Sequence, residues 1–493
     1  MGLDKRIIIT FLGFLFIAFI YIASFFTGEK NKEKSNFWDC KNCNVVIISM
    51  TSARMDHLST YGYSKDTSPN ISKLAQNGII FTNAFTQGSR TIGAGLSLFT
   101  SYYPYTHRVF DQFYSKKDLN PSVQSLTEIL KRNGYKTAAF TGGGHYKGIY
   151  GFDEGFDTYE DSQDFVGFGT SAPKAVEWLK KVKQPFFLFI QGFDAHCPYT
   201  PPSPYNRMFD PDYTNKNNID YSICYWSYYG TKPIEGGRGR KFPLKKVTDW
   251  GGVTKGSPEE DWKEEFFDKG DIQHLVSLYD GSIAYADSEI QKVLDTLYEL
   301  KLDKNTIIVF LADHGELLGE NGRFMRGGYL TGTYHDAVVH IPLIVKYPKM
   351  KGGKKVDGLV QVIDIAPTLL EFLNIPNYTY GQGKSLLRLI KTGEKINEYV
   401  YGGTSQYRKR TSRYFFRFFF NGTDEVDFIR NNEWKLVKET IINDDTNTTT
   451  ESYELYNLKN DPNELTNVLE KEIPIANDLK DKLKQWEQKY KTV

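Results

Sequence analysis

Three consecutive residues, Asp313, His314 and Gly315, place a carboxylate and an imidazole where a protein could use them. They come one residue after Ile307–Leu311, a continuous apolar run of the kind that forms a strand buried on both faces. Residues at the carboxyl end of such a strand lie where ligands bind in open α/β sheets. A carboxylate beside an imidazole is half of a divalent-metal site. For the pair taken alone, a turn capped by Asp313 is the simpler explanation, but the rest of the chain favours the site.

The pair needs a sheet to position it, and the sequence alternates strand and helix patterns over most of its length. Strand patterns cover residues 45–50, 79–85, 136–141, 186–190, 307–311 and 341–345, and helical patterns cover 69–75, 89–100, 123–133, 172–182, 271–300 and 363–373. This rhythm predicts an α/β fold with a doubly wound, mostly parallel central sheet.

The alternation breaks in two places. Residues 201–270 are rich in Tyr, Trp, Gly and charge and show no clear period. Such insertions are often lids or substrate loops, although surface decoration explains the composition equally well. From about residue 399, short aromatic strands precede a helical pattern at 475–490, as in an antiparallel sheet with a closing helix. We therefore predict a large domain over 44–390, which includes the insertion, and a smaller α+β domain over 399–493.

The composition excludes some classes of protein. The chain has 493 residues, enough to bury a large core. Its 61 basic and 60 acidic residues nearly cancel, so no basic face for nucleic acid is indicated. With 33 Tyr and 34 Phe, the chain has the aromatic content of a folded protein rather than a disordered one.

The N-terminal segment differs from the rest. Residues 7–26 carry no charge, and as a helix rising about 1.5 Å per residue they span a bilayer core of roughly 30 Å. A cleaved signal usually has a shorter apolar core and a small-residue exit, which Ala23–Phe26 does not resemble. We predict a single transmembrane anchor over 7–26 and a polar tether over 27–43. Basic residues flank the anchor on both sides, so their count does not decide its orientation.

The four cysteines, Cys40, Cys43, Cys197 and Cys224, leave three explanations open. Two disulfides would suit an oxidising compartment, and four inert thiols would suit a reducing one. Cys40 and Cys43 have the spacing of half a metal site, but no second pair is spaced to complete it.

Several short motifs, taken in chain order, resemble those of the sulfatase family in the alkaline phosphatase superfamily. Each motif is weak alone, but together they cover nearly everything from Asn44 to the C-terminus. They are Arg54–Leu58 with Tyr61–Tyr63, Ser97–Thr100 with Tyr103–Pro104, Gly151–Asp157, Asp194–Tyr199, His274–Asp287, Asp313–Glu316, Ile341–Val345, and Glu454–Leu458 with Asn460–Pro462. The resemblance implies an alkaline phosphatase-like fold and hydrolysis of an ester by one divalent cation and a nucleophile.

The resemblance assigns four residues to the cation and the nucleophile. Asp313 and His314 match two metal ligands of the family, and Thr51 stands where the family has its first metal-binding acid. Thr91 stands at the nucleophile, which is also a metal ligand. The implied cofactor is Ca²⁺, Mg²⁺ or Mn²⁺.

The resemblance also implies a set of substrate-binding residues. His196 and His145 match histidines that hold or protonate the ester oxygens, so we assign both to catalysis. We also assign Arg90 and Asp194 to substrate binding.

The chain departs from the family at the same positions. A sulfatase nucleophile is a formylglycine made from Cys or Ser, so none is expected at Thr91. The family arginine four residues later is Gly95, and the family lysine expected within 142–145 is missing. Thr51 and Ser52 replace carboxylates with hydroxyls, which are poor ligands for a hard cation.

We therefore expect a membrane-anchored sulfatase-like hydrolase acting on sulfuric or phosphoric esters at a single metal site. Its substrates would be sulfated or phosphorylated carbohydrates, lipids or surface polymers, met outside the cytoplasm at the cell membrane. Two alternatives remain open. One is a catalytically impaired relative that binds an anionic ligand or a partner, and the other is a transferase of phospho-groups that uses the threonine as nucleophile.

Overall fold

The computed structural model describes residues 37–214, 240–243, 262–265, 269–320, 324–326, 334–348, 350–375, 381–408 and 422–491. Its contacts divide the chain into Met1–Cys40 and Lys41–Val493, and the architecture below is that of the second unit. The predicted anchor at 7–26, most of the tether and Cys224 lie outside the described residues. Within the residues described, no helix is long and apolar enough to cross a membrane.

The central sheet has nine strands, of which eight run in the order β12-β2-β11-β8-β1-β5-β3-β4, with β13 paired to β2. The bounds are β1 Asn44–Met50, β2 Ile79–Phe85, β3 Lys136–Phe140, β4 Thr158–Glu160, β5 Phe186–Gly192, β8 Thr306–Leu311, β11 His340–Lys346, β12 Lys354–Val356 and β13 Val360–Gln361. Every residue of β1, β5 and β8 is buried, as the apolar runs predicted.

The pairing of the central strands brings the expected chemistry to one edge. β1 runs parallel to both β5 and β8, with Ser49 opposite Gln191 on one side and Leu311 on the other. The segments that follow these three strands therefore leave the sheet together. β11 is antiparallel to β8 and β2, so the predicted mostly parallel sheet is confirmed with one reversed strand.

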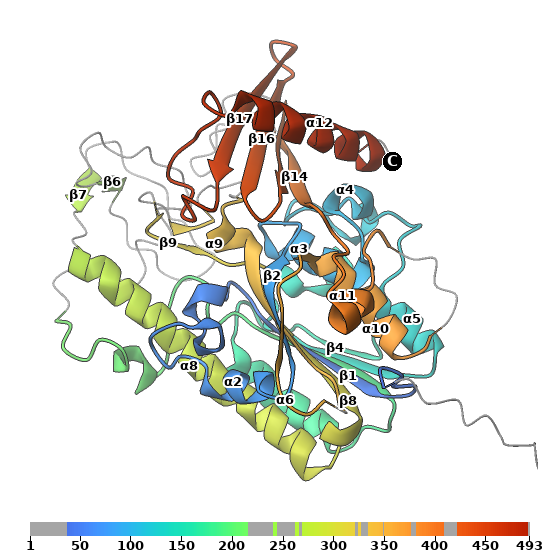
Figure 1. Cartoon of the computed structure of the whole chain (residues 1–493). Helices are drawn as coiled ribbons and strands as arrows, with labels where there is room; N and C mark the ends of the chain where they lie inside the picture. The colour runs from blue at the N-terminus through green and yellow to red at the C-terminus, as the bar shows by residue number, and fades with distance from the viewer. Residues whose placement is uncertain are drawn as a thin grey trace, which may run out of the picture. The chain divides into compact units, whose positions relative to one another are not determined.

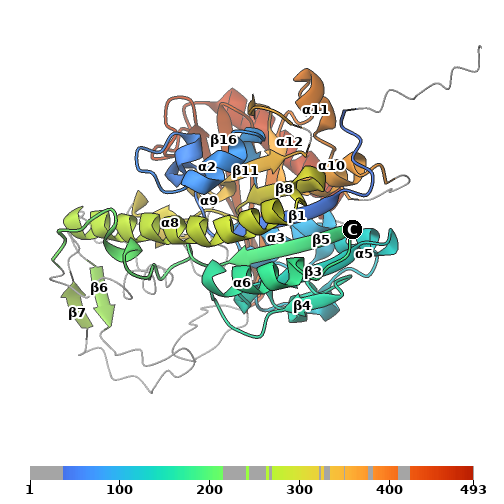
Figure 2. The same ribbon diagram turned by 90° about the horizontal axis from the view of Figure 1, so that it is seen from below.

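Helices cover both faces of this sheet (Figures 1 and 2). One layer contains α2 (Pro69–Ala75), α6 (Phe168–Leu179) and α8 (Lys269–Glu299). The other contains α3 (Thr91–Thr100), α5 (Leu126–Arg132) and α10 (Ile365–Phe372). The doubly wound arrangement follows from the alternation of strands and helices along the chain.

The starts of two predicted helices were wrong by three or four residues. α5 begins at Leu126 instead of residue 123, because Ser125 and Glu128 form a capping box in which each side chain accepts from the other's backbone N–H. α6 begins at Phe168 instead of residue 172, and it includes Pro173 within its first turns. Of the predicted insertion at 201–270, the described parts include a strand pair, β6 (Arg240–Pro243) with β7 (Trp262–Glu265).

The C-terminal part is a four-stranded antiparallel sheet, as predicted, and α12 (Ile473–Tyr490) packs across it (Figure 1). Its strands are β14 Val400–Arg408, β15 Gly422–Arg430, β16 Trp434–Asn443 and β17 Thr448–Asn457. Leu436, Leu455 and Trp486 share a core with Tyr103 and Tyr105, which lie just after α3. This shared core ties the C-terminal sheet to the body of the protein.

The described cysteines are all in disulfides: Cys40, Cys43 and Cys197 are bonded, and none is free. This decides among the explanations that the sequence left open, because neither inert thiols nor a metal site agrees with it.

Candidate active site

Thr91 and His314 form the closest pair of reactive side chains at the sheet edge. The distance between Thr91 Oγ1 and His314 Nε2 is 3.1 Å, and both residues are buried. His314 Nδ1 lies 2.9 Å from the carbonyl oxygen of Gly315, so Nδ1 carries the proton and Nε2 accepts from the threonine hydroxyl. Burial lowers the pKa of His314, which keeps the ring neutral and able to take a proton.

Thr91 is positioned by the start of a helix that is buried along its whole length. It is the first residue of α3, directly after Arg90, and all residues of α3 are buried. A Cβ on Gly95 would lie 2.9 Å from a ring carbon of Phe152 and 3.0 Å from one of Tyr146. The family arginine therefore has no space at this position in the present packing.

The segment in which the family lysine is missing, 142–145, has no space for a side chain at its three glycines, as Gly143 illustrates. Gly143 has φ +67, in the left-handed region, and a Cβ there would lie 1.5 Å from the carbonyl oxygen of Gln163. A side chain at this position would require the backbone to move. Two of the expected cationic groups are therefore excluded by packing as well as by sequence.

Asp313 is held by hydrogen bonds from the protein itself. It accepts from Thr51 Oγ1 at 3.3 Å, from the Ser52 backbone N–H at 3.3 Å and from the His314 N–H at 2.9 Å. Thr51 Oγ1 in turn accepts from Gln191 Nε2 at 2.8 Å. Asp313 and Thr51 thus belong to a continuous hydrogen-bonded chain.

The predicted metal ligands are neighbours, but their chemistry does not fit a divalent cation. Between successive donor atoms of Thr51, Asp313, His314 and Thr91, the distances are 3.3, 3.8 and 3.1 Å. Asp313 is the single carboxylate in this set, whereas hard cations are usually neutralised by several. In the part of the chain that the structure describes, no three His, Cys, Asp or Glu side chains group to hold a metal ion. The metal assignment stays a prediction that this donor set does not support.

Arg326 brings a positive charge to the site, and the sequence analysis missed it. It is 3% exposed, and its Nη1 lies 3.3 Å from His196 Nε2. Among the residues described, it forms no ion pair with a carboxylate, and its Nε has no hydrogen-bond partner. A buried cation of this kind is stabilised when an anion binds beside it. The sequence feature that could have identified Arg326 is its position in the Gly-rich loop that follows Asp313 and His314.

The two predicted catalytic histidines are neutral. His196 Nδ1 donates to the carbonyl oxygen of Cys197 at 2.6 Å, so Nε2 accepts from Arg326 and has no proton to give. Burial, with the charge of Arg326, lowers the pKa of His196 well below its usual value. Burial and the charges of Arg326 and Arg90 lower the pKa of His145 to about 3. Positive charge at the site therefore comes from the two arginines.

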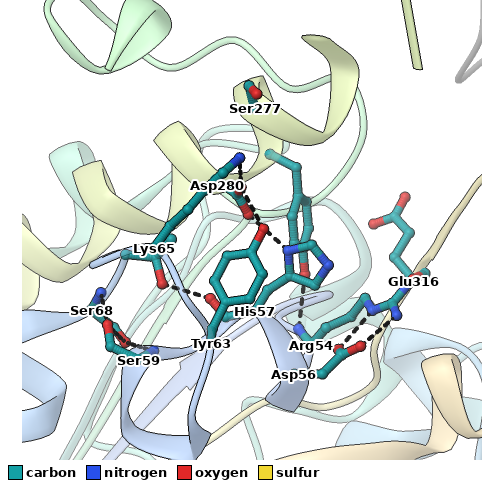
Figure 3. Close-up of polar contacts among 12 residues, drawn as sticks. Arg54, Asp56, His57, Ser59, Tyr63, Lys65, Ser68, Ser277, Asp280 and Glu316 are labelled. Atoms are coloured by element: carbon teal, nitrogen blue, oxygen red, sulfur yellow. Dashed lines mark hydrogen bonds and ion pairs between the residues drawn. The ribbon is translucent and has the colours of Figure 1, made fainter. Parts of the chain in front are cut away.

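The loop after β1 is anchored to α8, which holds Thr51 and Ser52 in place. Figure 3 shows Asp280 of α8 accepting from Tyr63 and Lys65, each at 2.8 Å, and contacting His57 Nδ1 at 2.7 Å. From the same loop, Arg54 Nη1 donates to the carbonyl oxygen of Glu316 at 3.1 Å (Figure 3). The segments after β1 and after β8 are thereby joined.

A cavity of about 490 Å³ opens beside His196. Phe165, Asp194 and Tyr285 are among the residues that line it. Asp194 Oδ2 accepts from the Phe168 N–H at 2.8 Å, and burial raises the pKa of Asp194 to about 7. The predicted substrate residue Asp194 therefore lies on the cavity wall, and no hydrogen bond links it to Thr91 in the described residues.

Comparison with known proteins agrees with this architecture. The family model described as Sulfatase matches residues 43–375, and the one described as N-sulphoglucosamine sulphohydrolase, C-terminal, matches residues 328–489. A curated sulfatase from Formosa agariphila is 26% identical over 72% of this chain and 74% of its own.

Two solved structures share the fold. A phosphonate monoester hydrolase of Agrobacterium radiobacter superposes with a TM-score of 0.67 at 20% identity, over 91% of this chain and 96% of that one. A protein in complex with its substrate D-glucosamine-2-N,6-O-disulfate superposes with a TM-score of 0.69 at 19% identity, over 92% and 99%. Because the Sulfatase model spans well over half of the residues, the chain belongs to the sulfatase family of hydrolases, in the alkaline phosphatase superfamily.

Proposed function

We propose that this protein hydrolyses sulfuric or phosphoric esters with the unmodified hydroxyl of Thr91 as its nucleophile. The observation that carries the proposal is the hydrogen bond of 3.1 Å between Thr91 Oγ1 and His314 Nε2, in a ring whose other nitrogen is bound to a carbonyl. A neutral imidazole held in this tautomer is a general base for the hydroxyl. Threonine is not a precursor of formylglycine, so the hydroxyl acts directly.

The reaction has two displacements. Thr91 Oγ1 forms a bond to the sulfur or phosphorus of the ester while its proton passes to His314 Nε2. The bond from the sulfur or phosphorus to the ester oxygen breaks. The departing alkoxide takes a proton from water. His314 releases this proton to solvent and then accepts one from the water that attacks the sulfur or phosphorus of the Thr91 ester. The bond from that sulfur or phosphorus to Oγ1 breaks, His314 returns the proton to Oγ1, and the free anion leaves. Arg326 and Arg90 offset the charge on the non-bridging oxygens.

No step passes through a divalent cation, because the donor atoms do not fit one. The family's relatives generally depend on such a metal, so this chain would differ from them in how it neutralises the ester. The two guanidiniums supply that charge in the proposal.

The cavity beside His196 is the place for the organic part of the ester. Its aromatic and carboxylic wall residues, such as Tyr285 and Asp194, suit the apolar faces and hydroxyls of a sugar. A sulfated or phosphorylated carbohydrate, free or within a lipid or surface polymer, is therefore the proposed substrate. The fold relative bound to a glucosamine disulfate is consistent with this class.

We place the protein outside the cytoplasm on the cell membrane. The disulfides of the described cysteines favour an oxidising compartment. The uncharged segment at 7–26 is the proposed anchor.

The test is a panel of chromogenic sulfate, phosphate monoester and phosphate diester substrates, run on the full-length chain in detergent. We expect Thr91→Ala to abolish turnover and Thr91→Ser to retain part of it. Thr127→Ala is the matched control, because Thr127 is a buried threonine whose hydroxyl has no partner within the described structure. Equal activity of wild type and Thr91→Ala would refute the proposal.

A second function is binding of an anion without turnover. It is favoured because the packing around Gly95 and Gly143 leaves no space for the arginine and lysine that the family uses. It predicts that sulfate or phosphate raises the melting temperature of wild type while no substrate in the panel is turned over. Arg326→Gln should weaken that stabilisation, because a hydrogen bond to a charged group is worth about 1.5–3 kcal/mol. Turnover that depends on Thr91 would exclude this function.

A further inference from the structure

We infer that this chain has dispensed with the divalent cation of its family, and that Arg90 and Arg326 neutralise the bound anion in its place. The inference concerns the site of the proposed function and rests on the same anionic substrate. It is carried by the charges, the hydrogen bonds and the backbone of the residues that would surround a cation.

The charges around the four donor atoms disfavour a divalent cation. Of the four atoms that would face a cation, one belongs to a carboxylate, one to a neutral imidazole and two to hydroxyls. Arg326 is buried and lies 3.3 Å from His196, and Arg90 is the residue directly before Thr91. A dication added here would face these positive charges with Asp313 as its one anionic ligand, and like charges repel strongly in a site shielded from water.

The side chains that would bind a cation are already hydrogen-bonded to the protein. Both oxygens of Asp313 accept from the protein, one from Thr51 Oγ1 and the other from the backbone N–H groups of Ser52 and His314. Thr51 Oγ1 also accepts from Gln191, and His314 Nε2 accepts from Thr91. Asp313, Thr51 and His314 therefore each accept a hydrogen bond from the protein, so these three groups have partners without a cation.

The backbone at position 52 can accommodate a carboxylate side chain. Ser52 has φ +65, in the left-handed region that Asp and Asn adopt more readily than most residues. Thr51 Oγ1 already lies 3.3 Å from Asp313 Oδ2. A carboxylate at position 51 would therefore lie beside Asp313, and one at position 52 would be carried by a residue whose backbone N–H already bonds to Asp313. Restoring them should therefore create a cation site.

The experiment compares full-length wild type with Thr51→Asp/Ser52→Asp. Each protein is incubated with Ca²⁺, Mg²⁺ or Mn²⁺, desalted and analysed for bound metal, and its melting temperature is measured with and without the cation. We expect no bound metal and no thermal shift for wild type. For the double variant we expect about one cation per chain and a melting temperature that rises with the metal.

The control is Thr449→Asp/Thr450→Asp, two adjacent exposed threonines of β17, which should bind no metal. If the double variant fails to fold without metal, Ser52→Asp alone is measured in its place. One tightly held cation in wild type, removable by a chelator with a fall in melting temperature, would overturn the inference. So would a folded variant that takes up no metal.

Bound metal and melting temperature are measured independently of ester turnover. A metal-free wild type that turns over no ester would overturn the proposed hydrolase and leave this inference standing. A wild type that is active and holds stoichiometric metal would overturn this inference and leave the proposed hydrolase standing.

Discussion

Lys435 of β16 joins a cluster of buried charges between the C-terminal sheet and the candidate site. Its Nζ lies 3.0 Å from Asp336 Oδ1 and 2.7 Å from Glu464 Oε1, and its side chain is fully buried. Arg430 contacts the other oxygen of Asp336 at 3.1 Å, and His335 contacts Glu464 at 2.7 Å. Burial alone would raise the pKa of Asp336, but the charges of Arg430 and Lys435 hold it well below its usual value.

Lys435→Met removes the charge and keeps most of the apolar stem. Asp336 retains Arg430, whereas Glu464, whose side chain is 2% exposed, retains the Asp336 N–H and His335, which is charged only when protonated. Removing one partner of a buried ion pair costs about 3–5 kcal/mol, so we expect the free energy of unfolding to fall by that amount. The variant should also weaken the site, because α9 (Asp336–Val339) begins in this cluster and accepts the Gly315 N–H at 2.6 Å.

Urea unfolding measures the loss, and activity or anion binding measures the effect on the site. Lys435→Met/Glu464→Gln should recover most of the stability, because the unpaired charge is then gone while the amide oxygen still accepts from the Asp336 N–H. Lys482→Met is the control: its pair with Asp478 is exposed, and its loss should cost under about 0.5 kcal/mol. The reasoning is refuted if Lys435→Met costs under about 1 kcal/mol or if the second substitution restores nothing.

Two further predictions test burial and packing near Thr91 and His314. Burial lowers the pKa of His107 to about 3, whereas in the unfolded chain the pKa of a histidine is about 6.5. As the pH falls below about 6.5, the unfolded state therefore takes up a proton that the folded state does not, and the free energy of unfolding decreases. Between pH 7.5 and 5.5 the free energy of unfolding measured in urea should fall by about 1.4 kcal/mol less in His107→Gln than in wild type, and equal slopes would contradict this. Gly315→Ala should lower stability by about 1–3 kcal/mol and disrupt the site, because its Cβ would lie 2.2 Å from the Ala337 carbonyl oxygen. An unchanged melting temperature and activity would contradict it.

Much of the fold followed from local patterns. The apolar runs at 45–50, 186–190 and 307–311 became the fully buried strands β1, β5 and β8, because a strand covered on both faces needs apolar residues at every position. Helix ends were less predictable. α5 starts where Ser125 and Glu128 cap each other, a local signal that apolar periodicity alone does not show.

The residue types of the candidate site were also evident in the chain. Thr91, Asp313, His314 and His196 were named from their motifs, and hydrogen bonds in the structure connect the first of them to His314 and the last to Arg326. Arg326 was missed because it follows a two-residue strand in a Gly-rich loop, where no periodic pattern marks a buried position. Its significance lies in its burial and in the absence of an ion pair to a carboxylate among the described residues.

The sequence by itself determined the sheet and the helices that cover it, because these depend on residue type and on short-range periodicity, and the family resemblance predicted Thr91 as the nucleophile. The tertiary structure decided what those residues touch. Thr51 donates to Asp313 across 262 positions, and Gly95 and Gly143 are closed by an aromatic ring and a carbonyl from other segments. Such contacts depend on strand register and on packing between distant segments, so the pattern of neighbouring residues does not contain them.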